Sequence, residues 1–586
     1  MNYTLNNNGA SQQKGATLDA LKRLVPLMKG EGTSVAIASV AILVNAIATL
    51  VAPVIISHTV DTAIKLKDYN GLAYNSFILV LIFISAVIGG YVQTIMMGGV
   101  GRRVLFQLRN AIFTKLQELP VAFFNQNKTG DLISRINSDT DRLNQFFSQA
   151  LLQFIRNFFL IAGAGVFLLV LSPRLGAASL APALGVLVVT QLISDWVKRK
   201  NLLSLQSLGN MSAEVQESLN NFKVIVAFNR VDYFRKKFDE TNGKNYTASI
   251  GAGYANNVFT PLYGLASNVA QLIVLAYGIL LITRGQMTIG LLIGFMLYVS
   301  NFYTPLQQMA SVWSSLQQAL AALDRISDVL AMESDMKVIP SEHVVSTSHV
   351  MEFRNVRFRY PDGSDVLKGI SLKLEPGKTY ALVGPTGGGK TTTASLMARL
   401  YDPTEGTILL NGKDIRSFTA EERAQKIGFI LQEPFLFTGT LLENIFYGNT
   451  IFAGKTKEEL LAAITASGLN DLLGHFESGL DTKIQTSGDT ISLGQRQLIA
   501  FLRAVMRKPE LLILDEATAN IDTVTEQLLQ EVIAKLPTST TKVVIAHRLN
   551  TIENADEIFF VNGGEVTAAG SLDHAVEMLM HSKRKS

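Results

Sequence analysis

Residues 384–391 read Gly384-Pro385-Thr386-Gly387-Gly388-Gly389-Lys390-Thr391, which fits the pattern G-x-x-x-x-G-K-[ST]. An apolar stretch, Tyr380–Val383, precedes this loop, and a helical pattern, Thr391–Leu400, follows it. In that order, the three segments form a phosphate-binding loop, whose backbone N–H groups and helix N-terminus hold phosphate oxygens. We therefore predict that all eight residues bind ATP. Lys390 should reach the β- and γ-phosphates, and the Thr391 hydroxyl should bind Mg²⁺.

The sequence around this loop, residues 349–580, follows the pattern of an α/β domain. Alternating apolar residues predict strands near Val356–Tyr360 and Ile370–Leu374. The pair Asn411-Gly412 is typical of a tight hairpin turn. Strand and helix patterns then alternate toward the C-terminus. We therefore predict an α/β P-loop nucleotide-binding domain over 349–580, joined to the preceding residues by a linker over 331–348.

Two carboxylates end an apolar run downstream of the loop. Residues 511–516 read Leu-Leu-Ile-Leu-Asp-Glu, which predicts a buried strand that ends at Asp515 and Glu516. Asp515 suits a hold on Mg²⁺, and Glu516 is placed to orient or deprotonate an attacking water. Such a run is a weak signal alone, but after a phosphate-binding loop it favours ATP hydrolysis.

The first 325 residues have a different composition, with long blocks that lack Asp, Glu, Lys and Arg. A bilayer core requires about 20 apolar residues of helix, and each block is long enough. One block contains a single charge, Arg156. After a polar tail over 1–17, we predict an all-α six-helix transmembrane domain with long cytoplasmic helix extensions over 18–330. Its membrane helices are expected near 34–57, 72–101, 143–172, 175–197, 254–283 and 286–318.

The polar segments between these blocks predict the orientation in the membrane. The segments 102–142 and 195–244 are long and rich in Lys and Arg, whereas the other connections are short. Positive residues favour the cytoplasmic side, so these segments, both termini and the nucleotide domain are expected in the cytoplasm. Apolar residues recur with a helical period in Val104–Leu119, so we expect the membrane helices to continue beyond the bilayer. Leu18–Lys29 is expected to form an amphipathic helix at the membrane surface.

The remaining composition excludes several classes of partner and site. The net charge of +4 is small for 586 residues and gives no support for nucleic acid as a partner. The chain has no cysteine, which excludes disulfides and thiolate metal sites. ATP and Mg²⁺ are therefore the only cofactors that the sequence predicts.

Between the two nucleotide motifs, Ile491-Ser492-Leu493-Gly494-Gln495 resembles the signature L-S-G-G-Q of ABC transporters. The resemblance implies that Ser492, Gly494 and Gln495 contact the ATP of a facing nucleotide domain. Further matches follow in the order of the family. They imply that Tyr360 stacks on adenine, that Gln432 senses Mg²⁺ and water in the Q-loop, that Asp522 is the D-loop aspartate, and that His547 is the switch histidine at the γ-phosphate. Glu516, His547 and Gln432 would be the catalytic residues, and Thr391, Gln432 and Asp515 the Mg²⁺ ligands.

The membrane half resembles the same family. Leu119–Phe124 and Gly130–Arg135 look like the first intracellular loop of type IV exporters, and Glu217–Phe228 looks like the second coupling region. The resemblance extends from about residue 18 to residue 580. It implies a half-transporter of the multidrug and lipid exporter type, which needs a second ABC half because each ATP site requires a signature from a facing domain.

The signature departs from the family pattern at Leu493, where a glycine is usual, and at Ile491. A leucine there could crowd the approach to the partner's phosphate. A complete catalytic carboxylate with a weakened signature resembles one subunit of heterodimeric bacterial exporters, so a heterodimer is favoured over the homodimer that remains possible.

The resemblance implies ATP-driven export of hydrophobic or amphipathic compounds, drugs or lipids, across the cytoplasmic membrane. A lipid or peptide flippase is the nearest alternative, and an ATP-gated channel or regulatory subunit on the same scaffold is a further one. Two features bear on the substrate. Arg156 could meet an anionic headgroup, or it could equally lie near the cytoplasmic end of its helix, where a charge costs little. Tyr298, Phe302, Met309 and Trp313 share a helix face that lines a cavity or, as is more usual, serves packing.

Overall fold

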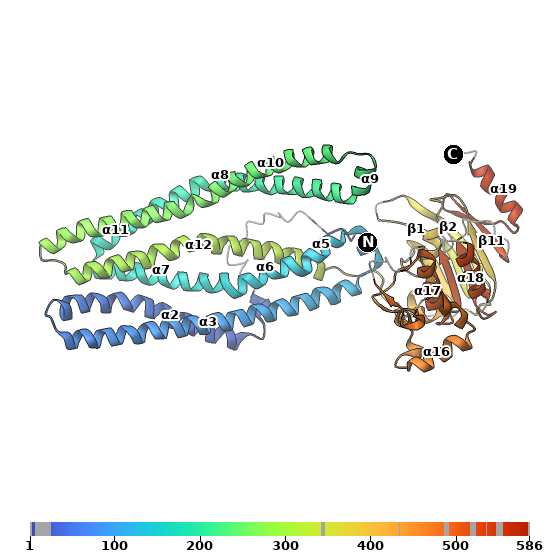
Figure 1. Cartoon of the computed structure of the whole chain (residues 1–586), viewed down its shortest axis with the longest axis horizontal. Coiled ribbons are helices and arrows are strands. Elements are labelled where there is room, and N and C mark those ends of the chain that lie inside the picture. The colour runs from blue at the N-terminus through green and yellow to red at the C-terminus, as the bar shows by residue number, and fades with distance from the viewer. Residues whose placement is uncertain are drawn as a thin grey trace. The chain divides into compact units, whose positions relative to one another are not determined.

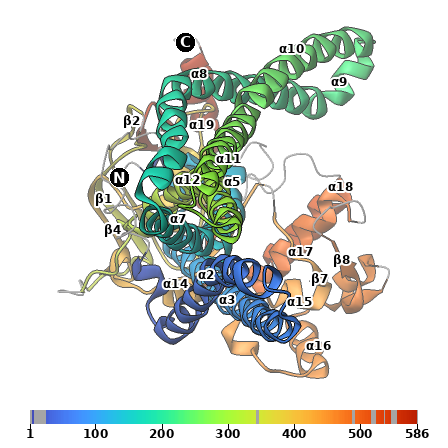
Figure 2. The same cartoon turned by 90° about the vertical axis from the view of Figure 1, so that its left-hand side faces the viewer.

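The computed structural model describes residues 3–5, 25–340, 346–361, 363–432, 434–476, 478–485, 491–515, 523–534, 536–545 and 555–583. The chain divides into two compact units (Figure 1, Figure 2). The helical unit consists of Leu5–Gln117 and Thr129–Ala331. The α/β unit consists of Met1–Thr4, Glu118–Lys128 and Met332–Ser586.

Six helices within the described ranges are long and apolar enough to cross a membrane, which confirms the six-helix prediction. These candidate spans are Gly32–Ile64, Tyr69–Glu118, Thr129–Leu171, Pro173–Asn220, Val231–Thr283 and Ile289–Leu330. The elements that form them and their connections are η1 (Val25–Met28), α2 (Gly32–Thr59), η2 (Val60–Ile64), α3 (Tyr69–Glu118), α5 (Thr129–Ser134), η3 (Arg135–Asp139), α6 (Thr140–Gln145), η4 (Phe146–Ala150), α7 (Leu151–Leu171), α8 (Pro173–Asn220), α9 (Phe222–Ala227), α10 (Val231–Asn257), α11 (Phe259–Thr283) and α12 (Ile289–Leu330).

Several of these helices are much longer than a bilayer is thick. Helix α3 has 50 residues, so it spans ~75 Å, against a hydrocarbon core of ~30 Å. Helix α8 has 48 residues. The polar segments 102–142 and 195–244 are largely helical, so the membrane helices continue beyond the apolar blocks, as the apolar period of Val104–Leu119 predicts for the first segment. Of the expected surface helix Leu18–Lys29, only Val25–Met28 forms a helical turn, and residues 18–24 lie outside the described residues.

Helix α12 lies among α2, α7 and α11 in both views (Figure 1, Figure 2). Tyr298 holds it there, because its hydroxyl donates to the Leu50 carbonyl at 2.6 Å and its ring stacks on Phe167 at 5.0 Å between centroids. Tyr298 is fully buried whereas Trp313, on the same predicted stripe, is 49% exposed. The aromatic stripe is therefore not one cavity wall, and at Tyr298 it serves packing.

The start of α12 is fixed against the end of the first span. The Asp61 carboxylate accepts a hydrogen bond from the Gly290 backbone N–H at 2.9 Å and another from the Thr288 hydroxyl. A Cβ atom at Gly290 would lie 2.1 Å from the Ser57 carbonyl oxygen. The two backbones can approach this closely only because Gly290 has no side chain.

The α/β unit contains twelve strands within the described ranges. They are β1 (Met351–Arg359), β2 (Asp365–Leu374), β3 (Thr379–Val383), β4 (Glu405–Leu410), β5 (Lys413–Asp414), β6 (Ile427–Ile430), β7 (Gly439–Thr440), β8 (Lys483–Ile484), β9 (Leu511–Asp515), β10 (Thr541–Ile545), β11 (Glu557–Asn562) and β12 (Glu565–Ala568). Its helical elements are α4 (Val121–Gln126), α13 (Lys390–Met397), η5 (Ile415–Ser417), α14 (Ala420–Lys426), α15 (Leu441–Ile445), η6 (Thr450–Phe452), α16 (Lys457–Ala466), η7 (Asn470–His475), η8 (Gly479–Asp481), α17 (Leu493–Val505), α18 (Thr523–Ala534) and α19 (Leu572–Lys583).

The main sheet has the strand order β12-β11-β3-β10-β9-β6. Strands β11, β3, β10, β9 and β6 are parallel to one another, and only β12 is antiparallel. Their carboxyl ends therefore meet at one edge, where ligands bind in open α/β sheets. The predicted hairpin at Asn411-Gly412 is confirmed, because both residues have positive φ, 51° and 75°, and join β4 to β5.

An N-terminal strap, formed by Tyr3 and Thr4, belongs to the α/β unit. The sequence predicts a polar tail over 1–17, but Tyr3 is only 1% exposed, and residues 6–17 lie outside the described residues. The Tyr3 backbone N–H donates to Gln126 Oε1 at 2.7 Å, and its carbonyl accepts from Asn127 Nδ2 at 2.9 Å. Its hydroxyl hydrogen-bonds to the Asp335 carboxylate. The strap therefore joins helix α4 to the segment that follows α12.

Candidate nucleotide-binding site

The predicted phosphate-binding loop joins the carboxyl end of β3 to the start of α13. Gly384, Gly387 and Gly389 have φ values of 151°, 80° and 113°, which favour glycine over other residues. A Cβ atom at Gly388 would lie 2.6 Å from the Val561 carbonyl oxygen on β11. The loop is thus a tight backbone turn whose shape depends on glycine, as a phosphate cradle requires.

Lys390 and Thr391 are the first two residues of α13. Lys390 is 5% exposed, and its Nζ donates to the carbonyl oxygens of Gly384 and Pro385 at 2.9 and 3.1 Å. The Lys390 ammonium group therefore lies against the phosphate-binding loop, where the oxygens of a bound phosphate would also be. Thr391 is exposed in the first helical turn, so its hydroxyl is accessible to an ion. These residues fit Mg²⁺-ATP by charge and by donor type.

Asp515 and Gln432 lie at the same edge of the sheet as the loop. Asp515 is the last residue of β9 and is 7% exposed. Its neighbour Leu514 pairs with Ile430, the last residue of β6, and Gln432 follows two residues later. Because β6, β9 and β3 run in parallel, the predicted Mg²⁺ and water-sensing residues converge on the edge from which the phosphate loop begins.

Tyr360 is held beside the helix that follows the loop. Its hydroxyl hydrogen-bonds to Thr392 Oγ1 at 3.2 Å. Its ring meets Phe358 and Tyr401 edge-on, with centroids 4.8 and 5.4 Å away. The sequence did not predict a role for Thr392, which lies in the first turn of α13 and contacts Tyr360. This contact orients an aromatic ring close to the phosphate loop, as an adenine platform requires.

The signature segment begins α17 through a capping box. The Ser492 side chain accepts from the Gln495 backbone N–H at 3.1 Å, and the Ser492 N–H donates to Gln495 Oε1 at 3.0 Å. Leu493 is half-buried and packs against the apolar core around α17, and Gly494 is buried. The leucine side chain is therefore engaged by its own unit, which weakens the argument that it crowds a partner's phosphate.

Three predicted functional residues, Glu516, Asp522 and His547, lie outside the described residues. The structure therefore leaves their roles as predictions. Glu516 directly follows Asp515 in the sequence, and His547 comes two residues after Ile545 at the end of β10.

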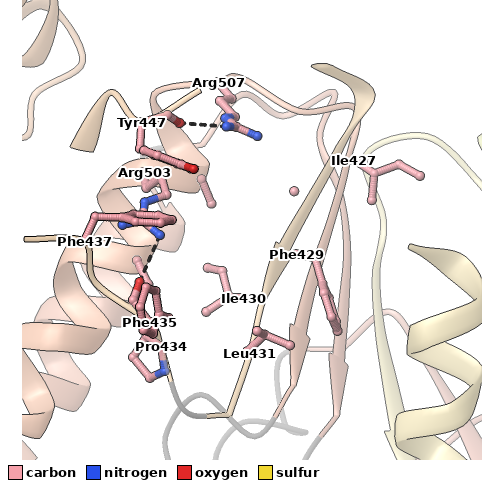
Figure 3. Close-up of a pocket in the computed structure, with 13 residues that line it drawn as sticks. Ile427, Phe429, Ile430, Leu431, Pro434, Phe435, Phe437, Tyr447, Arg503 and Arg507 are labelled. Atoms are coloured by element: carbon pink, nitrogen blue, oxygen red, sulfur yellow. Dashed lines mark hydrogen bonds between the residues drawn. The ribbon is translucent and has the colours of Figure 1, made fainter. Parts of the chain in front are cut away.

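A pocket of about 260 Å³, the Q-loop pocket, adjoins the Q-loop between β6 and α17 (Figure 3), and no local sequence pattern indicates it. Leu431 and Pro434, on either side of Gln432 along the chain, both line it. Arg503 from α17 donates to the Phe435 carbonyl at 3.2 Å, and Arg507 donates to the Tyr447 carbonyl at 2.7 Å. An occupant of this pocket would contact the segment that positions Gln432.

Comparisons with known proteins agree with this geometry. The family model described as the ABC transporter transmembrane region matches residues 35–306, and the family model described as ABC transporter matches residues 367–519. An uncharacterized ABC transporter ATP-binding protein of Bacillus subtilis is 33% identical over 91% of this chain and 88% of its own length. A fatty acid ABC transporter ATP-binding/permease protein of Mycobacterium bovis is 31% identical over 86% of this chain and 79% of its own length.

A multidrug resistance ABC transporter ATP-binding and permease protein of Lactococcus lactis is 30% identical over 85% of this chain and 84% of its own length. This chain matches both family models, one after the other, in one polypeptide. The glycine loop, the signature helix and the six spans occur together in one chain. The chain therefore belongs to the ABC transporter family, as an exporter-type half-transporter with ATPase activity.

Proposed function

We propose that this protein exports hydrophobic or amphipathic compounds, drugs or lipids, at the expense of ATP hydrolysis. One observation carries the proposal: a phosphate loop at the carboxyl edge of a parallel sheet is fused to six apolar spans in a single chain. Relatives named for multidrug resistance and for fatty acids, each similar over most of this chain, support a hydrophobic substrate.

In the proposed site, Lys390 and the loop amides hold the phosphates, and Tyr360 supports the adenine. Thr391, Asp515 and Gln432 would bind Mg²⁺, directly or through water, and the ion would neutralise charge that develops on the transferred phosphoryl group. Glu516 would orient or deprotonate the attacking water, and His547 would contact the γ-phosphate.

The proposed working unit is a dimer of two ABC halves, since the described residues contain one phosphate loop and one signature helix. Ser492, Gly494 and Gln495 would contact the ATP held by the partner, and the Asp522 loop would lie at the same interface. We favour a heterodimer, because Ile491 and Leu493 depart from the family signature. Leu493 packs against the core of its own unit, so its side chain does not provide a steric reason for this preference. The preference for a heterodimer depends only on the departure from the signature sequence.

Closure of the two nucleotide domains must be transmitted to the membrane helices. The short helix α9 supports such a role, because its apolar side chains are exposed, with Phe222 58%, Val224 55% and Val226 51% exposed. The Q-loop pocket in the α/β unit is lined largely by apolar side chains, so it could bind such an exposed apolar helix. We propose that a helix tip from the partner half occupies this pocket and thereby links Gln432 to substrate transport.

We also propose a multi-pass location in the cytoplasmic membrane, with the nucleotide domain in the cytoplasm. The Lys- and Arg-rich segments 102–142 and 195–244 support this orientation.

Reconstituted transporter tests the proposal directly. Glu516→Gln should retain ATP binding and lose most of its turnover, about 100-fold or more, because water activation is removed. Lys390→Ala should instead lose ATP binding. Uptake of an amphipathic dye into inside-out vesicles should stop in both variants. Normal hydrolysis in Glu516→Gln would contradict the site assignment, and dye uptake without ATP would contradict export.

Isolation of the tagged chain with an equal amount of a different ABC half would support the heterodimer.

A further inference from the structure

An apolar groove runs along the surface between helices α2 and α7, which lie side by side in the helical unit (Figure 1, Figure 2). Its volume is about 310 Å³. The walls come from one face of each helix and include Leu43, Ile47 and Leu50 from α2, and Phe159, Gly163 and Phe167 from α7. Residues at spacings of three, four and seven share a helix face, so both walls are continuous apolar stripes.

The floor of this groove is closely packed. A Cβ atom at Gly163 would lie 2.3 Å from Leu50 Cδ1, so the Leu50 side chain lies directly over the glycine at mid-groove. Phe167 is fixed by its stacking on Tyr298, whose hydroxyl is hydrogen-bonded to the Leu50 carbonyl. Residues of three helices therefore pack together at the floor of the groove, and a preformed site loses less entropy when it binds a ligand.

A guanidinium group lies at one end of the same stripe. Arg156 precedes Phe159 by three residues, Gly163 by seven and Phe167 by eleven, so all four share one face of α7. Its Nε is buried and has no hydrogen-bond partner, and none of the described carboxylates pairs with it. The residue as a whole is half-buried. A buried N–H donor without an acceptor is costly, so the side chain is suited to bind an anion.

The position of Arg156 fits the headgroup of a membrane amphiphile. Fifteen residues separate it from Leu171, the last residue of the span, which corresponds to ~22 Å of a ~30 Å hydrocarbon core. Its guanidinium can thus reach the headgroup level at the N-terminal side of the span by extending along the helix. From Arg156 to Phe167 the stripe runs ~16 Å through the apolar region.

We propose that the α2–α7 groove binds one long-chain carboxylate amphiphile, a molecule of the fatty acid class, with its carboxylate on Arg156 and its chain toward Phe167. This inference rests on the proposed export function and names the substrate class for it. The groove volume is at the lower end of the ~300–1,000 Å³ range of small-molecule sites, which favours one acyl chain over two. A relative 31% identical to this chain carries a name that specifies fatty acids.

Photo-crosslinking tests the groove without requiring ATP hydrolysis. The full-length transporter, in whichever dimer it forms, is incubated in detergent with a diazirine-bearing hexadecanoate, with the matching hexadecanol, or with a diazirine-bearing anionic diacyl phospholipid. We expect the hexadecanoate to label peptides of α2 and α7 most strongly. Arg156→Gln should weaken labelling by the carboxylate about tenfold or more and leave that by the alcohol unchanged, because one charge-assisted hydrogen bond is lost.

Matched controls separate the groove from general folding effects. Val166→Trp fills the groove and should reduce labelling by both single-chain probes. Val170→Trp introduces the same bulk one turn later on α7, at a residue that is 74% exposed and outside the groove. Arg174→Gln removes an exposed charge at the start of α8. Both controls should retain wild-type labelling and wild-type basal ATPase activity.

Three results would overturn the proposal: equal carboxylate labelling in Arg156→Gln, no effect of Val166→Trp, or preferential labelling by the phospholipid. Glu516→Gln should keep full labelling, because binding to the groove precedes hydrolysis. The labelling experiment therefore still tests binding to the groove even if ATP-driven export fails. Loss of α2 and α7 labelling with intact dye transport would refute the groove alone.

Discussion

At the scale of single residues, Ser492 carries two roles that can be separated. It caps α17, and we propose that it contacts the partner's ATP. Thr456 caps α16 through the same kind of box, on the surface and far from the nucleotide motifs in the sequence. Ser492→Ala and Thr456→Ala should each cost about 0.5–2 kcal/mol of stability through the lost cap.

Only Ser492→Ala should also lower the ATPase rate measured at saturating ATP, because only the Ser492 hydroxyl is proposed to contact a phosphate. Thermal unfolding and steady-state hydrolysis together check the pair. Equal ATPase rates in the two variants would show that Ser492 acts as a cap only.

Leu493 illustrates what the sequence could not predict at this scale. The sequence identified the departure from glycine but suggested steric crowding, since the direction of a side chain depends on the neighbours it packs against. In the structure, Leu493 packs against a core assembled from segments far away in the chain. By contrast, the glycines of the phosphate loop were predictable, because a local backbone conformation requires them.

At the scale of elements, the capping boxes should respond differently to acid. Helices α14 and α16 use Glu422 and Glu459, and hydrogen bonds from the Thr419 and Thr456 backbones hold the pKa of each carboxyl below its usual value. A lowered pKa stabilises the folded state above the unfolded value near 4.5, and this contribution disappears as the pH falls through the folded value. Helix α17 uses Gln495, which does not titrate.

We therefore expect that acidification from pH 7 to below pH 4 speeds backbone hydrogen exchange in the first turns of α14 and α16, after correction for the intrinsic rate. The first turn of α17 should change less. Equal acceleration in all three helices would contradict this assignment.

A second prediction at this scale concerns the N-terminal strap and helix α4. Tyr3→Ala should speed hydrogen exchange in α4, because it removes the ring that packs edge-on against Phe123 at 6.5 Å between centroids, together with the hydroxyl bond to Asp335. Tyr3→Phe should have an intermediate effect, about 1 kcal/mol, since it removes only the hydroxyl. Tyr233→Phe, at an exposed tyrosine of α10, is the matched control and should change nothing. Unchanged exchange in Tyr3→Ala would refute the anchoring role.

The sequence predicted elements with local signals, and missed those made by distant contacts. The spans, β1, β2, β3, β9 and the Asn411-Gly412 hairpin follow from period, polarity and turn residues over short windows. The strap does not, because Tyr3 and Asp335 are separated by 332 positions and neither stands in a recognisable pattern. The Q-loop pocket was missed for the same reason, since its lining comes from β6, α17 and the segments between them.

At the scale of the whole molecule, ATP turnover should require two chains. Because each proposed site combines the phosphate loop of one half with the signature of the other, hydrolysis per chain should fall as the protein is diluted below its dimerisation constant. Measurement of particle mass and ATPase rate on the same dilution series checks this expectation. Full turnover in fractions that contain a single chain would contradict it.

The N-terminal strap also offers a position at which a fluorophore would follow the movement of the α/β unit. The chain has no cysteine, so Thr4→Cys would give a single labelling position without further changes. Thr4 is exposed beside the buried Tyr3, and a fluorophore attached there would move with α4 and the segment around Asp335. Energy transfer between this dye and a second dye on the nucleotide domain of the partner half would therefore record the approach and separation of the two ATP-binding domains during the proposed transport cycle.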